Sequence, residues 1–267
     1  MTKIAGKNIL ITGAASGIGK IMSRIVLEKN AAKLIIWDIN PENIKKTMAE
    51  LSAYSSSIFS YLVDVSDSAM VQQFAEKVKS EVGNIDILIN NAGVVVGKPF
   101  HEHSHKDIDL TMQINTSALM HIALCFINQM IENKSGHIVN IASAAGMVAN
   151  PRMSVYCASK WAVIGWSESV RLEMESNKTG VNITTVTPYY INTGMFEGVK
   201  SLIPILNAEK SAKKIISAIE RNRLILRMPF IVYLLPFSKG ILPLRWFDWI
   251  VGKLLGIYHT MDKFTGR

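Results

Sequence analysis

The chain reads Asn8-Ile-Leu-Ile-Thr-Gly-Ala-Ala-Ser-Gly-Ile-Gly19 near its start, and this stretch decides the fold. Residues 8–12 form a short apolar run, which is typical of a buried strand in a parallel sheet. Residues 20–29 continue with a helical pattern. A glycine-rich turn between a strand and a helix lets the backbone approach a pyrophosphate, whose negative charge the helix N-terminus favours. Such glycines can also form a plain turn, but the strand before them and the helix after them favour nucleotide binding.

The alternation of strands and helices continues along the chain. After the first strand we predict strands over residues 33–37, 58–63, 85–89, 137–142, 181–186 and 224–227. The predicted helices cover residues 20–29, 41–52, 67–82, 106–131 and 153–175. This alternation is typical of an α/β fold with a parallel sheet, and 267 residues are enough for one large domain. We divide it into a catalytic part (1–228, with a substrate loop at about 189–210) and an apolar, basic extension (229–267).

The second predicted strand ends in an acidic residue, Asp38. An acid about 20 residues past the glycine turn is placed to accept hydrogen bonds from the ribose hydroxyls of adenosine. Its charge would also repel a 2′-phosphate, and no Lys or Arg occurs in the glycine turn or in Ile39-Asn40 to bind one. We therefore expect NAD rather than NADP. Asp38 could also cap the helix that begins near Pro41, and this role is compatible with the first.

Polar residues follow two further strands. Asp64-Val65 closes the third strand and Asn90-Asn-Ala-Gly93 closes the fourth. Ligands of open α/β sheets bind at the carboxyl ends of the strands, so we expect both segments near a ligand. Asn115 lies inside the predicted helix 106–131, where asparagine is unfavourable, and this indicates a specific hydrogen-bonding role.

The helix predicted over residues 153–175 contains Tyr156-Cys-Ala-Ser-Lys160, and Ser143 lies thirteen positions before Tyr156. Tyr156 and Lys160 are four apart, so their side chains emerge from the same helix face. A nearby ammonium can lower the pKa of a phenol by about one to three units. Tyr156 could then act as a general acid or base near neutral pH, with Ser143 binding the same substrate oxygen. Taken alone, the pair also fits an ordinary helix.

Histidine and cysteine do not indicate a metal site. The run His101-Glu-His-Ser-His105 has histidines at alternate positions, which could ligate zinc from an extended segment. Because it follows Pro99 at the start of a helix, we expect a solvated loop and no metal. Cys125 and Cys157 fall in apolar helical stretches and suit a reducing compartment, so we expect packing residues.

The net charge of +8 is placed unevenly. Residues 1–199 contain 17 Lys+Arg and 17 Asp+Glu, whereas residues 200–267 contain 12 and 4. These basic residues are interleaved with Leu, Ile, Phe and Trp, a pattern that favours a membrane surface over nucleic acid. Nothing before the first strand has the composition of a secretion signal. We expect a cytoplasmic protein that is peripheral on a membrane or lipid surface and binds no nucleic acid.

The C-terminal extension is the part that suggests this contact. Residues 228–238 are uncharged, but the run is too short to span about 30 Å of hydrocarbon. Residues 242–255 combine basic side chains with aromatic ones such as Trp246 and Trp249, which suits the headgroup boundary. We expect residues 229–258 to contact a membrane surface and to wall the substrate entrance. The alternative is that they pack over the sheet edge or a dimer partner.

Taken together, these residues resemble a short-chain dehydrogenase/reductase over essentially the whole chain. The matching elements are Thr12-Gly-Ala-Ala-Ser-Gly-Ile-Gly19, Asp64-Val65, Asn90-Asn-Ala-Gly93, Asn115, Ser143, Tyr156 with Lys160, and Pro188 with Thr193. The resemblance implies a Rossmann-like, doubly wound sheet of seven parallel strands in a single domain. It implies nicotinamide-dependent chemistry between alcohols and carbonyls. It also implies a homodimer or homotetramer built from the helices that contain Asn115 and Tyr156.

The resemblance also implies roles for individual residues. Tyr156 would exchange the proton of the substrate oxygen, Lys160 would bind the nicotinamide ribose and lower the tyrosine pKa, and Asn115 would hold a water. The catalytic set would be Asn115, Ser143, Tyr156 and Lys160. The cofactor would contact Gly13, Ser16, Gly17, Ile18, Gly19, Asp38, Asp64, Val65, Asn91, Ala92, Gly93, Tyr156, Lys160, Pro188, Ile191 and Thr193. The substrate would contact Ser143, Tyr189, Met195 and Phe196.

Within the family, residues 188–196, 202–206 and 255–262 are similar to the epidermal-type retinol dehydrogenases and, more distantly, to the lipid-droplet 17-beta-hydroxysteroid dehydrogenases. Many members have glycine where this chain has Tyr189, so we expect a narrower pocket. The expected function is NAD-dependent oxidation of a hydrophobic alcohol, such as a retinoid, sterol or long-chain alcohol. One alternative is an NADP-dependent reductase of acyl or polyketide carbonyls, against which Asp38 argues. Another is a non-catalytic cofactor-binding membrane scaffold, which would not need Ser143, Tyr156 and Lys160.

Overall fold

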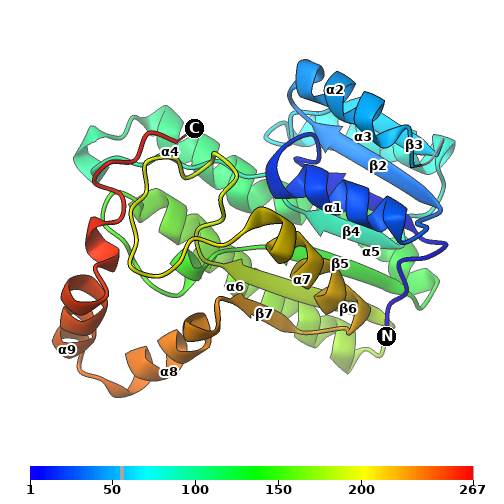
Figure 1. The fold of residues 1–267 in the computed structure, drawn as a ribbon. Coiled ribbons are helices and arrows are strands. Elements are labelled where there is room, and N and C mark those ends of the chain that lie inside the picture. The colour runs from blue at the N-terminus through cyan, green and yellow to red at the C-terminus, as the bar shows by residue number, and fades with distance from the viewer. Residues whose placement is uncertain (55–56, 267) are drawn as a thin grey trace.

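A computed structural model describes residues 1–54 and 57–266. Its centre is a parallel sheet of seven strands in the order β3-β2-β1-β4-β5-β6-β7 (Figure 1). The strands are β1 Asn8–Thr12, β2 Lys33–Asp38, β3 Ile58–Leu62, β4 Ile87–Asn90, β5 Gly136–Ile141, β6 Val181–Pro188 and β7 Ile225–Met228. The Rossmann-like doubly wound sheet and the single domain are thereby confirmed.

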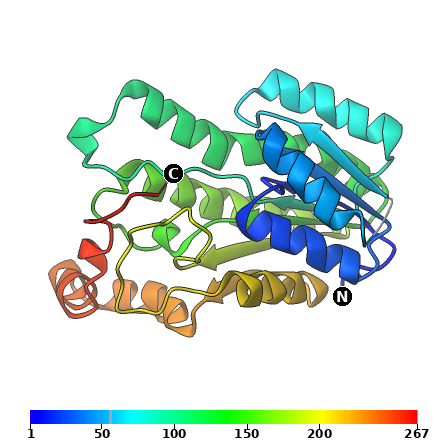
Figure 2. The same ribbon diagram turned by 45° about the horizontal axis from the view of Figure 1, so that its top comes forward.

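Helices cover both faces of the sheet (Figure 2). On one face the apolar side chains come from α1 Gly17–Glu28, α2 Pro41–Leu51 and α7 Ala208–Glu220. On the other face they come from α3 Ser68–Glu81, α5 Ala118–Glu132 and α6 Ser154–Ser176. The central strands are buried on both faces, which explains their continuous apolar runs. Two hydrophobic cores result, one on each side of the sheet.

The order of strands reverses direction between β1 and β4, and a crevice forms there at the carboxyl ends. Helix α1 begins at Gly17, inside the glycine turn and three residues earlier than the sequence predicted. The N-terminus of this helix therefore lies directly at the crevice. This is the position at which a helix end favours a bound phosphate.

The long helix predicted over residues 106–131 is observed in three parts: α4 His105–Met112, a π-helical turn over Gln113–Ser117, and α5. Together His105–Glu132 form a 28-residue helix that contains an 18-residue window with a mean hydropathy of 1.4, so it is long and apolar enough to cross a membrane. However, Ile122, Phe126 and Met130 are buried against the sheet, and the Phe126 ring lies 6.2 Å from that of Trp37. Burial in the protein core explains part of the apolar composition, since 44% of the apolar window lies inside the fold, whereas Leu124 is exposed.

The extension after β7 folds into short helical segments: Phe230–Tyr233, α8 Leu234–Ile241, α9 Leu244–Asp248, a π-helical turn Trp249–Leu254 and Ile257–His259. One side of this segment is packed, since Val232, Leu235, Phe247, Val251 and Ile257 are buried in a separate hydrophobic cluster. The sequence left open whether the extension contacts a membrane or packs on the protein. Its inner side packs on the protein. Its last residue, Arg267, lies outside the described residues.

His137 on β5 is a buried titratable group in the sheet. Its ring nitrogens lie 2.8 Å from Thr184 Oγ1 and 3.0 Å from Thr2 Oγ1, and burial lowers its pKa to about 4. An unfolded histidine has a pKa of about 6.5, so between the two values the unfolded chain binds more protons than the folded one. Acidification from pH 6.5 to 4 should therefore destabilise the protein.

We predict that His137→Gln reduces the loss of unfolding free energy over this pH window, by up to about 3 kcal/mol. Glutamine keeps hydrogen-bonding capacity but cannot take up the proton. Urea unfolding at pH 6.5, 5 and 4 measures the slope for both proteins. Equal slopes would show that His137 does not hold a depressed pKa.

Candidate active site

The glycine turn is fitted closely against the loop after β4. Asn91 donates through Nδ2 to the carbonyl oxygens of Thr12 at 2.9 Å and Gly13 at 3.1 Å. Thr12 Oγ1 in turn accepts the backbone N–H groups of Asn91 and Ala92, both at 3.0 Å. A Cβ on Gly13 would lie 3.0 Å from Ala92 Cα, and one on Gly19 would lie 2.1 Å from the Gly13 oxygen. Side chains are excluded at both positions because backbone occupies the space.

Asp38 is held against this turn. Its Oδ2 accepts from Ala15 N at 2.9 Å, and its Oδ1 accepts from Asn40 N at 3.0 Å. The side chain of Asn40, not Asp38, caps α2 by accepting from Asn43 N. Asp38 therefore does not serve as the helix cap considered from the sequence. Its carboxylate is fixed beside the glycine turn with a small exposed fraction of 8%.

A cleft of about 520 Å³ runs along the carboxyl edge of the sheet. Among the residues proposed from the sequence, it is lined by Gly13, Ser16, Gly17, Ile18, Asn91, Ala92, Gly93, Ser143, Tyr156, Lys160, Pro188, Tyr189, Ile191, Thr193, Met195 and Phe196. These residues come from segments far apart in the sequence, and the fold brings them together.

Five of the proposed residues lie outside the lining. Gly19 is packed under the turn, and Asp38 sits beside it. Asp64 Oδ1 accepts from the backbone and hydroxyl of Ser66, and Val65 is buried in the apolar core. Asn115 lies behind the cleft and is described below with its partners.

The cleft also contains residues that the sequence analysis missed, namely Asn43, Ile141, Ala142, Gly194 and Glu197. Asn43 lies in the first turn of α2, at the same sheet edge as Asp38. Its place after the second strand was a signal that could have identified it. Gly194 and Glu197 belong to the loop after β6, whose path cannot be derived from local sequence.

Ser143, Tyr156 and Lys160 converge at one end of the cleft. Lys160 Nζ donates to the Ile141 oxygen at 3.0 Å and lies 5.7 Å from the centroid of the Tyr156 ring. Ser143, at the end of β5, accepts from Ala145 N at 3.1 Å. The i, i+4 spacing on α6 thus places the phenol and the ammonium on one face, and the strand end supplies the hydroxyl.

Burial acts on both titratable groups of this set. It raises the pKa of the Tyr156 phenol, while a hydrogen bond from Ser143 acts in the opposite direction. Burial also lowers the pKa of Lys160 to about 8. Desolvation of the phenol is the largest influence on the pKa of Tyr156, and the expected lowering of this pKa by Lys160 stays a prediction. Both groups are shifted toward their neutral forms.

Asn115 occupies the π-helical turn between α4 and α5. Its Oδ1 accepts from Val94 N at 2.8 Å, and its Nδ2 donates to the Val94 oxygen at 2.9 Å and to Ser159 Oγ at 3.2 Å. A π-helical turn widens a helix locally and is frequent at functional sites. The unfavourable asparagine thus joins the loop after β4 to the helix that contains Lys160.

A second, apolar cavity opens beside Ser143. Its walls come from the loop after β5, the loop after β6 and the C-terminal extension, including Val148, Ile203, Leu235 and Ile257. Tyr189 lines both the cleft and this cavity, and its hydroxyl is 2.7 Å from Ser201 Oγ. The side chain that replaces the common glycine therefore stands at the junction between the two spaces.

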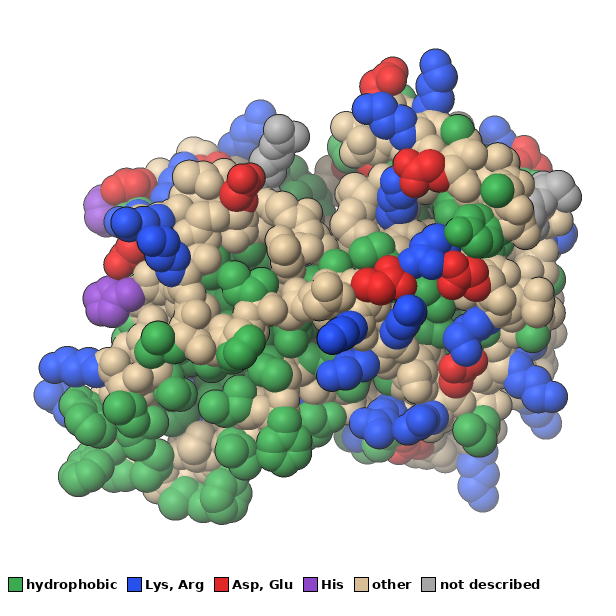
Figure 3. Space-filling model, in the orientation of Figure 1, with side chains coloured by type: hydrophobic (Ala, Val, Ile, Leu, Met, Phe, Trp, Pro, Cys, Tyr) green, Lys and Arg blue, Asp and Glu red, His purple; other side chains and the backbone are tan. Residues whose placement is uncertain are grey.

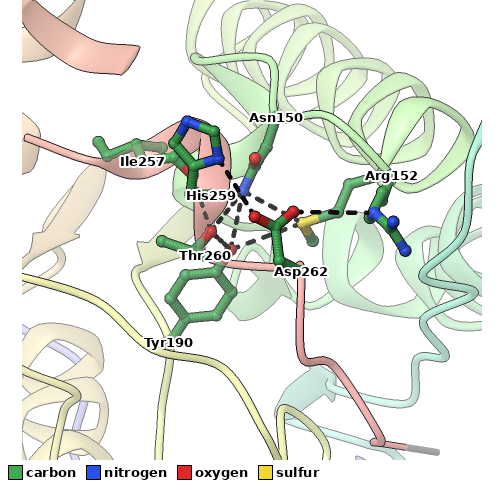
Figure 4. Close-up of polar contacts among 8 residues, drawn as sticks. Asn150, Arg152, Tyr190, Ile257, His259, Thr260 and Asp262 are labelled. Carbon is green, nitrogen blue, oxygen red and sulfur yellow. Dashed lines mark hydrogen bonds and ion pairs between the residues drawn. The ribbon is translucent and has the colours of Figure 1, made fainter. Parts of the chain in front are cut away.

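A buried polar cluster fastens these three segments together (Figure 4). Asn150 Nδ2 donates to Tyr190 Oη and to Thr260 Oγ1, and the two oxygens lie 2.9 Å apart. Thr260 Oγ1 also donates to the Ile257 oxygen at 2.8 Å. The cluster joins the loop after β5, the loop after β6 and the C-terminal tail.

From this cluster, residues 260–265 of the C-terminal tail run along the substrate loop at residues 197–200. Thr265 N donates to the Glu197 oxygen at 2.9 Å, and Lys200 N donates to the Thr260 oxygen at 3.3 Å. Glu197 lines the cleft, so the tail holds one of its walls. The local sequence gave no signal for these two contacts, which join residues 68 and 60 positions apart.

We predict that Thr260→Val loosens this wall and raises KM for the substrate several-fold. The loss of a buried hydrogen-bonding hydroxyl should destabilise the fold by about 1–3 kcal/mol, because Asn150 and Tyr190 lose a partner. Steady-state kinetics and thermal unfolding measure the two effects, and Thr260→Ser, which keeps the hydroxyl, is the control. An unchanged KM in Thr260→Val would limit the cluster to a stabilising role.

Comparison with known proteins identifies the family of this chain. Residues 7–202 match the family described as short chain dehydrogenase. Epidermal retinol dehydrogenase 2 of Mus musculus is 37% identical, with 99% of this chain and 87% of the relative covered. Estradiol 17-beta-dehydrogenase 11 of Macaca fascicularis is 32% identical, with 91% and 81% covered. The resemblance to the retinol and steroid dehydrogenases of this family is confirmed.

Solved structures agree. A short-chain dehydrogenase/reductase from Burkholderia phymatum in complex with NAD has a TM-score of 0.82 and 25% identity, with 90% of this chain and 95% of that one covered. A metagenomic short-chain oxidoreductase in complex with NADP has a TM-score of 0.72 and 26% identity, with 85% and 97% covered. The fold is thus one that binds a nicotinamide cofactor, and the chain belongs to the short-chain dehydrogenase family, whose named relatives are oxidoreductases.

Proposed function

We propose that this protein is an NAD-dependent oxidoreductase that interconverts a hydrophobic alcohol and its aldehyde or ketone. The observation that supports this most directly is the continuity of the site. The cleft at the glycine turn meets a second, apolar cavity at Ser143, beside Tyr156 and Lys160. A retinoid, sterol or long-chain alcohol has the matching chemistry, with one reactive hydroxyl on an apolar body.

The residues of the cleft fit a dinucleotide. The glycine turn leaves no space for side chains at Gly13 and Gly19, and the N-terminus of α1 opens toward the cleft. In this proposal the turn holds the pyrophosphate, Asp38 accepts hydrogen bonds from the adenosine ribose, and Lys160 binds the nicotinamide ribose. The nicotinamide, when bound, supplies the hydride acceptor or donor.

Tyr156 exchanges the substrate proton in this proposal. During oxidation its oxygen accepts the proton of the alcohol, while Ser143 holds the substrate oxygen by a hydrogen bond. Because burial raises the pKa of the phenol, the anionic form depends on the nearby Lys160 ammonium and on Ser143. Asn115 acts as a positioning residue, since its contacts to Val94 and Ser159 fix the surroundings of Lys160.

Asp38 supports NAD over NADP, since its buried carboxylate would face a 2′-phosphate with a like charge. This argues against an NADP-dependent reductase of acyl or polyketide carbonyls. The relatives named as retinol and estradiol dehydrogenases support an alcohol with a large apolar body. A non-catalytic scaffold is disfavoured because it would not need Tyr156, Lys160 and Ser143 together in the cleft.

The proposal includes a dimer or tetramer and a membrane location. Exposed Leu124 on α5 and Leu172 on α6 support association through these helices. Exposed Trp246 and Trp249 in the extension support a peripheral position on a membrane or lipid surface at the cytoplasmic side.

Tyr156→Phe tests the acid–base role. It keeps the ring but removes the hydroxyl, so we expect kcat to fall by at least about 100-fold while NAD still binds. Steady-state rates and titration of NAD by fluorescence measure the two quantities. Tyr61→Phe, which removes a hydroxyl on β3 that donates to Glu81, is the control. Activity of Tyr156→Phe within tenfold of wild type would contradict the assignment.

Asp38→Ala tests cofactor selection. We expect wild type to have the higher kcat/KM with NAD, and the substitution to lower the NAD-to-NADP ratio by about tenfold or more, because repulsion of the 2′-phosphate is relieved. Asp38→Asn separates charge from structure, since its amide oxygen can still accept from Ala15 N. A wild-type preference for NADP would show that Asp38 does not select the cofactor.

A further inference from the structure

The outer side of the C-terminal extension carries an exposed apolar surface. Figure 3 shows hydrophobic side chains gathered at the lower left, over the region of α8 and α9, whereas charged side chains of both signs are spread over the right half and the upper left of the view. The exposed large apolar residues of this segment and the adjacent substrate loop, here called the outer face, are Leu202, Ile205, Phe230, Leu234, Phe237, Ile241, Leu244, Trp246, Trp249 and Leu254. Isolated exposed apolar side chains are common, but a group of this kind indicates an interaction surface.

The outer face and the apolar cavity are two sides of one wall. At four places a residue of the outer face is followed in sequence by a residue that lines the cavity: Leu202 and Ile203, Phe230 and Ile231, Leu234 and Leu235, Leu254 and Leu255. Leu234 is 52% exposed and Leu235 only 8%. Since each pair comprises consecutive residues, the wall is about one layer of side chains thick.

Behind this wall the cavity leads to the reacting groups. Ser143, Tyr189 and Phe196 line both the apolar cavity and the cleft that contains Tyr156 and Lys160. An apolar molecule that passed the wall would therefore meet Ser143 without crossing a polar surface. The wall is built from short segments and turns, which separate from one another more readily than the strands of the sheet.

The charges around the outer face suit an anionic lipid surface. Arg245 and Lys253 lie among the apolar residues of α9 and the following turn. Lys239 on α8 is turned toward the protein, since its Nζ donates to the Met147 oxygen at 3.3 Å and lies 4.6 Å from the centroid of the Trp161 ring. The one acid of these three segments, Asp248, accepts a hydrogen bond from Tyr258. Aromatic rings together with more cations than acids are typical of a segment at the headgroup boundary. The segments are too short to span the hydrocarbon, so they fit contact with one leaflet.

We propose that the outer face rests on an anionic lipid bilayer and that the hydrophobic alcohol passes from the lipid through this wall into the cavity. The proposal rests on the proposed function for the identity of the substrate. It adds the partner, a bilayer surface. It also adds the route, which passes between the substrate loop at Leu202 and the segments that begin at Phe230 and end at Leu255 when these parts of the wall separate. The substrate does not leave the apolar phase on its way to Ser143.

The first measurement is binding. The full-length protein is co-sedimented with phosphatidylcholine vesicles that contain or lack phosphatidylserine, at low and high salt. We expect binding that requires phosphatidylserine and weakens with salt. A triple variant, Leu234→Gln with Trp246→Ala and Trp249→Ala, should lose it. Leu224→Gln is the matched control, because Leu224 is 50% exposed but lies before β7, at the opposite end of that strand.

The second measurement is turnover of a long-chain alcohol dissolved in the same vesicles, compared with a short, water-soluble alcohol. The triple variant should lose about tenfold in kcat/KM for the vesicle-borne alcohol, which corresponds to the burial free energy of about one apolar side chain. Its rate with the soluble alcohol should stay unchanged. Leu224→Gln should match wild type with both.

The outcomes separate the two proposals. If wild type turns over neither alcohol with NAD or NADP, the proposed function fails, while vesicle binding still reports on the surface. If wild type oxidises the alcohols but does not bind the vesicles, or the triple variant equals wild type with the vesicle-borne alcohol, the route is wrong. If the triple substitution instead converts an oligomer to a monomer in light scattering, the occupant of the outer face is a second copy of this chain, and the bilayer assignment is overturned.

Discussion

The hydroxyl of Thr12 holds together the two strands between which the sheet order reverses. It accepts the backbone N–H groups of Asn91 and Ala92, so the ends of β1 and β4 are fixed to one another. Asn91 then binds the carbonyl oxygens of Thr12 and Gly13. These bonds fix the path of the glycine turn, so that the N-terminus of α1 lies at the crevice. Backbone atoms then occupy the space that side chains at Gly13 and Gly19 would need. Every other part of the site is arranged along this edge.

Burial of the phenol and the ammonium produces an electrostatic conflict at the other end of the cleft. Desolvation raises the pKa of Tyr156 and lowers that of Lys160, so each group favours its neutral form. Proton exchange near neutral pH requires the opposite tendency for the tyrosine. Only groups that contact the phenol, such as Ser143, or a cation on the same helix face can act against burial. The spacing of Tyr156 and Lys160 matters for this reason.

The C-terminal extension has two different sides. Its inner residues complete the apolar cavity, and Thr260 joins the buried cluster with Asn150 and Tyr190. Its outer residues remain exposed as a continuous apolar group. A segment with this arrangement gives up part of the stability that full burial would provide, because apolar area stays in contact with water. A partner that covers the outer face would remove this apolar area from water and recover that stability.

The sequence by itself determined the strands of the sheet, the order of the elements along the chain and most of the residues that line the cleft. Continuous apolar runs at strand positions, the glycine turn and the i, i+4 pair Tyr156 and Lys160 are local patterns, and local geometry dictates their structure. The tertiary structure alone decided three other features. It showed that Asp38 is held beside the glycine turn by Ala15 N, that desolvation is the largest influence on the pKa of Tyr156, and that residues 260–265 hold the substrate loop. Each depends on desolvation or on contacts between distant segments, and neither is encoded in the spacing of neighbouring residues.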